Sequence, residues 1–319
     1  MNATEQPPSS SASRELPTIS VVIPVLDAEA TLGPCLAGLE RQDYPPERVE
    51  RMVVDNGSGD RSAEIARSHG GTTLLEEPRR GSYAARNRGV AASHGEIVAF
   101  LDPDCEPGPG WLERVAENFR DPDVRLVCGR RRVDDGSPLL ASLMEYEVAK
   151  DERVLGGDDS GALYGFTCNM AVRRDVLAST GGFVELQRGA DTLLVQAVAS
   201  RWGGRAVRFD PRMEVLNLEL AGPVGYWRKN FLYGFHRRRN NAIRASRPLS
   251  TAERLAIFRE VVRRKGYGPA RTAALLGGLG VGAACWQAGW AVAAIAGRAG
   301  SAEPHFELGD EETRSRDAS

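Results

Sequence analysis

Several features that define common functional classes are absent from this 319-residue chain. Its five cysteines and four histidines show no CxxC or other metal-ligand spacing, which argues against zinc and is typical of reduced cytosolic thiols. The formal net charge is −2, so no overall positive field would draw the chain to nucleic acid. Residues 24–29 contain no glycine, although a dinucleotide-binding turn needs glycine there to admit pyrophosphate. We therefore expect neither zinc, nor nucleic acid, nor NAD as a partner.

Residues 1–17 also lack the basic start and apolar core of a secretory signal peptide, and they are rich in Ser, Pro, Glu and Gln. Residues 298–319 are acidic and equally poor in large apolar side chains. Both segments are predicted to be disordered tails, because such compositions bury too little apolar surface to fold. Between them, a chain with 42% hydrophobic residues is long enough for one large α/β domain and an appendage.

Apolar, β-branched runs alternate with helical patterns over the first hundred residues. Residues 18–25 are typical of a buried parallel strand, and Leu32, Leu36 and Leu39 recur on one face of a helix. The alternation predicts a doubly wound α/β sheet, whose ligands bind beyond the carboxyl ends of the strands. The expected strands are 18–25, 49–55, 72–75 and 97–101, and the expected helices are 28–41, 61–68 (capped by Asp60) and 82–93.

The fourth predicted strand ends in two carboxylates one residue apart, Asp102 and Asp104. Their repulsion would be relieved by a hard divalent cation such as Mg²⁺ or Mn²⁺, which takes oxygen ligands and often completes its shell with phosphate. The bland alternative is a solvated loop in which Asp forms a turn, and Pro103 fits it. Because Pro24 and Asp55 end two other strands, the pattern favours a site for a metal and a diphosphate at one edge of the sheet.

Four blocks resemble family 2 glycosyltransferases in their order and spacing. They are residues 21–24 (VVIP), 53–58 (VVDNGS), 85–89 (ARNRG) and 100–104 (FLDPD). The resemblance extends over roughly residues 18 to 215. It implies a GT-A fold, in which a doubly wound mixed sheet is flanked by helices. It also implies a nucleoside-diphospho-sugar donor and inversion at the anomeric carbon.

The resemblance also implies roles for individual residues. Asp55 would recognise the base or ribose, Asp102 would contact the ribose or the metal, and Arg86 would lie near the nucleotide as a cation. Asp104 would bind the metal that bridges the diphosphate. The predicted donor-binding residues are Pro24, Val25, Asp27, Asp55, Arg86 and Asp102, and the predicted ligands of a divalent metal (Mg or Mn) are Asp102 and Asp104.

The family places its general base, an aspartate, after a Gly-Gly-Phe segment. Residues 181–183 have that sequence here, and Asp191 follows them, so Asp191 resembles the catalytic base. Ala190 stands where the family usually has an acidic residue, and Asp191 alone could equally be a helix N-cap. The family's frequent histidine near the end of the domain is missing. Asn217 stands near its place, which leaves a third metal ligand open.

Two further segments have more than one reading. Residues 164–170 resemble the family's acceptor-side segment, but they could simply be a strand of the mixed sheet. Glu145 and Glu147 are expected on a helix that faces water, and Asp158 and Asp159 are expected in a loop.

The C-terminal third points to a membrane. From Arg228 to Lys265, twelve Lys or Arg residues stand against two acidic ones, and aromatic residues are interleaved. Residues 272–297 carry no charge, and about 20 predominantly apolar residues suffice to span a bilayer. The basic block before this stretch would hold the catalytic domain at the cytoplasmic face. The stretch also fits an interfacial helix whose basic neighbours bind anionic headgroups.

The expected organisation follows from these patterns. It comprises a tail (1–17), a GT-A domain (18–220) with a nucleotide-sugar half (18–105) and an acceptor half (106–220), a basic amphipathic helical region (221–271), a membrane helix (272–297) and an acidic tail (298–319).

We interpret the chain as an inverting glycosyltransferase at the cytoplasmic membrane that acts on a lipid-linked or polysaccharide acceptor of the cell envelope. A nucleotidyltransferase would need a glycine- and base-rich loop after the first strand, and residues 26–32 lack one. A non-catalytic nucleotide-sugar-binding or scaffold protein of a polysaccharide synthesis complex remains an alternative.

Overall fold

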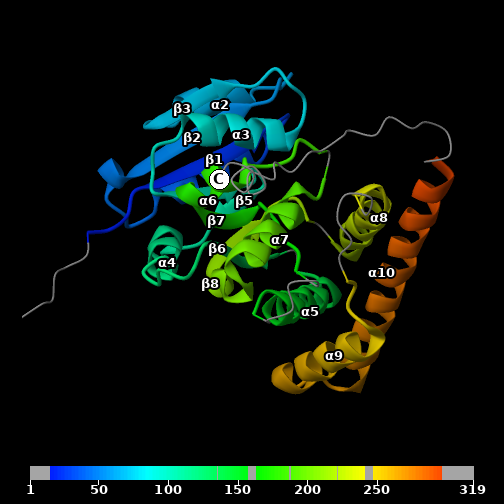
Figure 1. Ribbon diagram of the computed structural model, residues 1–319. Coiled ribbons are helices and arrows are strands. Elements are labelled where there is room, and N and C mark those ends of the chain that lie inside the picture. The colour runs from blue at the N-terminus through cyan, green and yellow to red at the C-terminus, as the bar shows by residue number, and fades with distance from the viewer. Residues whose placement is uncertain are drawn as a thin grey trace, which may run out of the picture.

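The computed structural model describes residues 15–134, 136–156, 163–186, 188–220, 222–240 and 247–296. Its strands are β1 (Ile19–Val25), β2 (Val49–Asp55), β3 (Thr72–Glu76), β4 (Ile97–Leu101), β5 (Cys105–Pro107), β6 (Leu126–Arg132), β7 (Asn169–Arg173) and β8 (Val207–Asn217). Over the described residues they form one sheet in the order β3-β2-β1-β4-β7-β6-β8-β5, with helices on both of its faces (Figure 1).

The first half of the sheet is parallel, as the sequence predicts. β1 lies between β2 and β4 and runs parallel to both, and β3 pairs in parallel with β2. Every residue of β1 is buried, because helices cover both faces, and this explains its continuous apolar run. The four strands begin and end within one residue of their predicted bounds.

Two hydrophobic cores lie on opposite faces of the sheet. Val21 and Ile23 of β1 join one core, whereas Val22 joins the other, because successive side chains of a strand alternate. The first core packs against α1, α2 and α4, and the second against α3, α6 and α7. The helices of this part are α1 (Leu32–Glu40), α2 (Ser62–Ser68), α3 (Ser82–Ala92), α4 (Trp111–Asn118), α5 (Pro138–Leu155), α6 (Arg174–Thr180) and α7 (Ala190–Trp202), with short 3-10 turns η1 (Pro46–Arg48) and η2 (Gly204–Ala206).

The first helix begins four residues later than predicted. Ser62 Oγ accepts a hydrogen bond from the amide of Ala28 (2.9 Å), and Asp60 Oδ2 accepts one from the amide of Glu29 (2.9 Å). These bonds tie the segment before α1 to the loop before α2, so helical geometry starts only at Leu32. The helix α2 begins one residue late, and Arg61 occupies its N-cap position, so the prediction that Asp60 caps this helix is wrong. Asp60 Oδ1 instead accepts from the Ser62 amide (2.9 Å) within the preceding turn.

The second half of the sheet is mixed. β7 is antiparallel to both β4 and β6, β6 runs parallel to β8, and β5 is antiparallel to β8. Of the segment 164–170, only its last two residues lie in β7, so the interpretation of the whole segment as a strand is wrong.

The expectation that Glu145 and Glu147 face water is also wrong, although both lie on α5. The Glu147 side chain is 16% exposed, pairs with Lys150 and accepts a hydrogen bond from Tyr226 Oη (2.7 Å). Glu145 pairs with Arg130 (3.0 Å) and Lys265 (2.9 Å). The helix α5 is covered by β6 and by the C-terminal helices. This burial cannot be predicted from the sequence of α5 alone, because the covering elements lie elsewhere in the chain.

Three helices follow the sheet: α8 (Gly222–Asn240), α9 (Thr251–Lys265) and α10 (Pro269–Ala296). α8 and α10 lie side by side (Figure 1). A Cβ at Gly234 would stand 2.0 Å from the carbonyl oxygen of Trp286, and one at Gly289 would stand 2.0 Å from that of Phe231. The two backbones therefore touch where glycine permits it.

The long apolar helix predicted near the C-terminus is present as α10, which is long and apolar enough by length and composition to cross a membrane. The predicted loop aspartates 158 and 159, residues 1–14 of the N-terminal tail, and residues 297–319 lie outside the described residues.

Candidate active site

The carboxyl ends of β1 and β2 meet at one edge of the sheet. Val25 is paired with Asp55 in the register of the two strands, and Pro24 and Val25 are buried within β1. Asp55 Oδ1 accepts hydrogen bonds from the amide (2.9 Å) and hydroxyl (2.7 Å) of Ser58. Asp27 has a positive φ of 51°. Its Oδ1 accepts from the amide of Gly59 (2.8 Å), so its carboxylate joins the two loops.

Asp102 directly follows β4 and contacts Arg86 of α3. The buried Arg86 guanidinium donates to Asp102 Oδ1, and among the described residues its Nε has no hydrogen-bond acceptor. Burial raises the pKa of Asp102, the Arg86 charge opposes the rise, and the Asp104 carboxylate adds to it. A partly buried carboxylate whose pKa is raised beside a second one is an environment that a further cation would stabilise.

Asp104 is held from β8 by Asn217. Asn217 Nδ2 donates to Asp104 Oδ2 (2.8 Å), while its Oδ1 accepts from the amide of Leu220 (2.8 Å). The described residues contain no cluster of three or more His, Cys, Asp or Glu side chains arranged around a metal. The pair Asp102 and Asp104 nevertheless suits Mg²⁺ or Mn²⁺, since such ions often take one or two carboxylates and complete their shell with substrate phosphates.

Asp191 lies in the first turn of α7, where the helix dipole favours a carboxylate. Gly189 occupies the N-cap position, so the alternative interpretation of Asp191 as the N-cap is wrong. Burial raises the pKa of Asp191, while the Thr192 amide, which donates to its Oδ1 (2.8 Å), and the Arg86 charge oppose the rise. A raised pKa makes a carboxylate a better proton acceptor at neutral pH.

Tyr83 links Asp191 to the Asp102 side of the site, although no sequence motif points to it. Its hydroxyl oxygen accepts from the amides of Gly189 (3.1 Å) and Asp191 (3.5 Å). The Arg86 guanidinium lies 5.3 Å from the Tyr83 ring centroid. The same guanidinium donates a hydrogen bond to Asp102. One turn of α3 thus bridges the predicted base and the predicted metal ligands.

Two asparagines of the motif blocks, Asn56 and Asn87, hold other segments of the site through hydrogen bonds to their backbone. The side-chain amide of Asn87 donates to the carbonyl of Phe183 (2.8 Å) and accepts from its N–H (2.9 Å). Gly182 has a φ of 76°, and a Cβ there would stand 2.8 Å from Asn87 Oδ1. Asn56 makes three hydrogen bonds of 2.7–2.8 Å to the backbone of residues 77–81. The Gly-Gly-Phe segment and the loop before α3 are therefore both held by side chains of these blocks.

The segment 163–168 packs between α5, β6 and α7. The Tyr164 hydroxyl donates to Asp151 Oδ1, and Arg131 pairs with Asp151 Oδ2 (3.0 Å) and lies 4.0 Å from the Phe166 ring centroid. Burial raises the pKa of Asp151, and the Arg131 charge opposes the rise. A Cβ at Gly165 would lie 3.1 Å from the carbonyl oxygen of Asp191, so this segment borders the predicted base.

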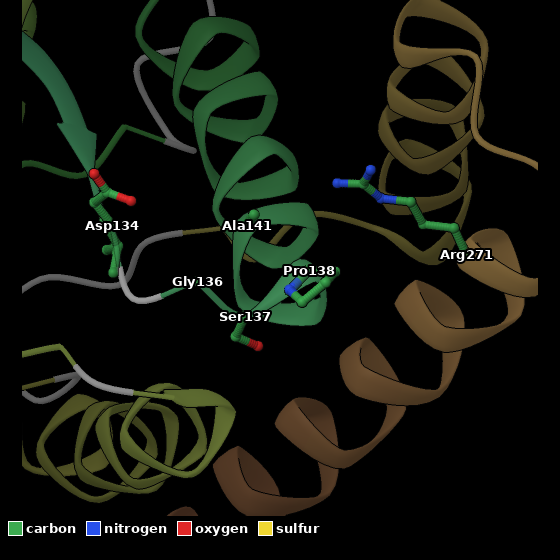
Figure 2. Close-up of a pocket in the computed structure, with 7 residues that line it drawn as sticks. Asp134, Gly136, Ser137, Pro138, Ala141 and Arg271 are labelled. Carbon is green, nitrogen blue, oxygen red and sulfur yellow. The ribbon is translucent and has the colours of Figure 1, made fainter.

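A cavity of about 330 Å³ lies elsewhere, between the start of α5 and the start of α10 (Figure 2). The Arg271 side chain extends from α10 towards α5 there and donates to Ser142 Oγ (2.9 Å). None of the predicted site residues lines this cavity, so it is separate from the strand-end site.

The chain is similar to known glycosyltransferases over the part that carries the strand ends of β1, β2 and β4. Residues 20–181, half of the chain, match Glycosyl transferase family 2. The glycosyltransferase AglE of Haloferax volcanii is 37% identical over 173 residues, which are 53% of this chain and 56% of AglE. An uncharacterised glycosyltransferase of Mycobacterium tuberculosis is 36% identical over 199 residues, which are 60% of this chain and 83% of that protein.

The fold also matches a solved structure, the mannosyltransferase PcManGT from Pyrobaculum calidifontis in complex with GDP-Man and Mn²⁺. The TM-score is 0.55 over 89% of this chain and 80% of that chain, with 21% sequence identity. The chain spans about half the length of AglE and of other curated relatives. The likeness in structure shows a GT-A-like fold, and the match over residues 20–181 shows that the chain belongs to glycosyl transferase family 2.

Proposed function

We propose that this protein transfers a sugar from a nucleoside-diphospho-sugar to an acceptor hydroxyl with inversion. The observation that carries the proposal is the bridge formed by Tyr83 and Arg86 between Asp191 and Asp102. It gives a half-buried carboxylate of raised pKa a defined place beside a strand-end carboxylate pair. A base on one side and a charged leaving-group site on the other are what a direct displacement at the anomeric carbon needs.

The residues divide the chemistry between them. The acceptor oxygen forms a bond to the anomeric carbon while its proton passes to Asp191. The bond from that carbon to the diphosphate oxygen breaks, and its electron pair stays on the diphosphate. Asp102 and Asp104 would hold a divalent cation, Mg²⁺ or Mn²⁺, which stabilises this charge as a Lewis acid. The nucleoside would be bound at the ends of β1 and β2, by Pro24, Val25, Asp27 and Asp55. PcManGT is solved with GDP-Man and Mn²⁺, which supports this assignment by analogy of fold.

We propose that the acceptor is lipid-linked or a polysaccharide, because α10 offers apolar side chains to a membrane. One face of α10 packs on α5 and α8, with Gly278 against Leu139 and Leu143 and Gly282 against Tyr226 and Trp227. Another face is exposed and carries Leu276, Val281, Trp290, Val292 and Ile295. Exposed apolar side chains beside a basic region fit a surface rich in anionic lipid.

An in-plane position of α10 at the cytoplasmic face is favoured over a transmembrane one. The Arg238 guanidinium of α8 lies 4.0 Å from the Trp290 ring centroid, in the second half of α10. A spanning α10 would carry this charge towards the far side of the bilayer, which is costly.

We propose the division of the chain into a catalytic domain (18–220, with donor and acceptor halves meeting near 105), a basic region (221–271) and a membrane-associated helix (272–297).

The test is turnover by Asp191→Asn. With a panel of UDP-, GDP- and dTDP-sugars, we expect the wild type to release nucleoside diphosphate even by slow transfer to water. Asp191→Asn should lower that rate about 1,000-fold, while its affinity for the nucleoside diphosphate stays within about twofold, because Asp191 contacts the acceptor and not the nucleotide. The matched control is Asp175→Asn, whose carboxylate is exposed on α6. Equal rates in all three proteins would favour the non-catalytic scaffold.

A further inference from the structure

Lys229 is a cation of α8 without a partner. Its side chain is half-buried, and among the described residues it makes no hydrogen bond and no ion pair. Two other cations that border the site are engaged with carboxylates, Arg86 with Asp102 and Arg131 with Asp151. An ammonium that is partly withdrawn from water and left unpaired is costly unless a ligand supplies negative charge.

The face of α8 that carries Lys229 is turned towards the catalytic part of the chain. Tyr226, Lys229 and Tyr233 are spaced three and four residues apart, so they lie on one face of the helix. Tyr226 Oη donates to Glu147 of α5 (2.7 Å), and Tyr233, although 47% exposed, lies close enough to Arg131 and Asp191 to interact with their charges.

An adjacent face of α8 packs on α10, and Tyr226 lies at the boundary, since a Cβ at Gly282 would stand 3.4 Å from its ring. Trp227 Nε1 donates to the carbonyl of Gly278 (3.0 Å), and Gly234 touches the backbone of Trp286. α8 therefore stands between the catalytic sheet and α10 (Figure 1). Contacts with α5 and with α10 fix the position of α8, and Lys229 therefore extends from a helix whose place is set by packing.

The start of α8 is tied to the strand-end carboxylates. Asn217 holds Asp104 through Nδ2 and the amide of Leu220 through Oδ1, and α8 begins two residues later at Gly222. Lys229 acts electrostatically on Asp102 and on Glu219. Burial and the charge of Asp104 raise the pKa of Glu219, and Lys229 opposes that rise.

We propose that Lys229 binds the diphosphate of the sugar donor and stabilises the charge that the leaving nucleoside diphosphate gains. The inference rests on the proposed function, since it supposes a diphosphate beside Asp102 and Asp104. One divalent cation does not neutralise two carboxylates and a diphosphate together, which leaves room for a second positive group. A lysine ammonium is a point charge that suits phosphate oxygens. The helix α8 would then complete the donor site from outside the segment matched by the family, residues 20–181.

The experiment is equilibrium binding to the full chain by calorimetry, with a nucleoside, its monophosphate and its diphosphate, each with and without Mn²⁺. We expect Lys229→Met to weaken diphosphate binding about tenfold or more, the usual size of a hydrogen bond to a charged group. Binding of the nucleoside alone should not change. Lys229→Arg should retain most of the affinity. The matched control is Arg228→Met, the neighbouring exposed cation, which should change neither affinity by more than about twofold.

Two results would overturn the inference while the proposed function stands. In one, Lys229→Met binds the diphosphate as the wild type does. In the other, it loses nucleoside and diphosphate affinity equally, which would mean a general loss of structure. A wild type that binds none of the nucleoside diphosphates would instead refute the proposed function, and the role of Lys229 with it.

Discussion

The predicted donor edge (the carboxyl ends of β1, β2 and β4) and the predicted acceptor body (α5, β6 and residues 163–168) hold their charged groups in opposite ways. At the donor edge, Asp55 and Asp102 each use one carboxylate oxygen for a protein contact and stand at strand ends near solvent. In the acceptor body, Asp151 is 1% exposed and has both oxygens engaged, one by Tyr164 and one by Arg131. Charges at the first place are available to a ligand, whereas charges at the second satisfy one another and hold the fold.

The largest effect should come from breaking the buried pair of the acceptor body. Arg131→Met leaves Asp151 buried without its cation and should lower the free energy of unfolding by about 3–5 kcal/mol. Urea denaturation measures this. Arg132→Met, the next residue of β6 with a largely exposed pair to Glu214, should cost less than about 1 kcal/mol. The double variant Arg131→Met/Asp151→Leu should regain part of the loss. A single-variant cost as small as that of Arg132→Met would contradict the comparison.

The donor edge should show the reverse pattern. Asp104→Ala should weaken Mn²⁺-dependent nucleoside diphosphate binding about 100-fold, the upper end of what loss of groups that hold a metal costs. Its unfolding free energy should change by less than about 1 kcal/mol, because the carboxylate is near the surface. Asp123→Ala, on an exposed turn, serves as the control for both measurements. If Asp104→Ala bound the nucleoside diphosphate with unchanged affinity and without Mn²⁺, the proposed metal site at this edge would be wrong.

A pair of glycine variants tests the contact that fixes α8. Gly289→Ala places a Cβ 2.0 Å from the carbonyl oxygen of Phe231, so it should cost about 1–3 kcal/mol and loosen α8. Gly280→Ala on the same helix meets open space and should gain about 0.5–1 kcal/mol from helix propensity. Limited proteolysis within α8 and thermal unfolding distinguish the two. Equal behaviour of the variants would mean that α8 and α10 are not in close contact.

The smallest expected effect concerns pH and Asp191. Burial raises its pKa in the folded state, so the folded state binds the proton more tightly than the unfolded chain does. The stability that this confers is present below the unfolded pKa and is lost as pH rises through the folded one. Asp191→Asn removes the buried charge and should therefore be more stable than the wild type at pH 7, by roughly 0.5–1 kcal/mol. The difference should vanish near pH 4, where the wild-type carboxyl is protonated. A variant that is less stable at pH 7 would contradict this account.

The sequence predicted the strands of the donor edge well because its evidence there is local. Each strand of the parallel half is a continuous apolar run, and each candidate carboxylate follows its strand within a few residues. The register of β1 and β2 then brings Val25 and Asp55 together without further information. The contact between Arg86 and Asp102 was not predicted, since the resemblance assigned each residue only a place near the nucleotide or the metal.

The acceptor body was predicted less well because its contacts join distant segments. Glu147 reads as a solvent-facing residue of α5, yet Tyr226, 79 positions later, covers it. Tyr83 belongs to no motif, yet it bridges to Asp191 across 108 positions. Such pairings depend on how helices pack on a finished sheet.

By itself, therefore, the sequence determined the family, the parallel half of the sheet and the strand-end carboxylates, since apolar periodicity and short motifs act over a few residues. Tertiary structure alone decided which side chains join the predicted base to the predicted metal ligands, that the charges of α5 are buried, and that α8 lies between the sheet and α10. The reason is physical: burial and ion pairing are properties of surfaces in contact, and those surfaces exist only once the helices have packed.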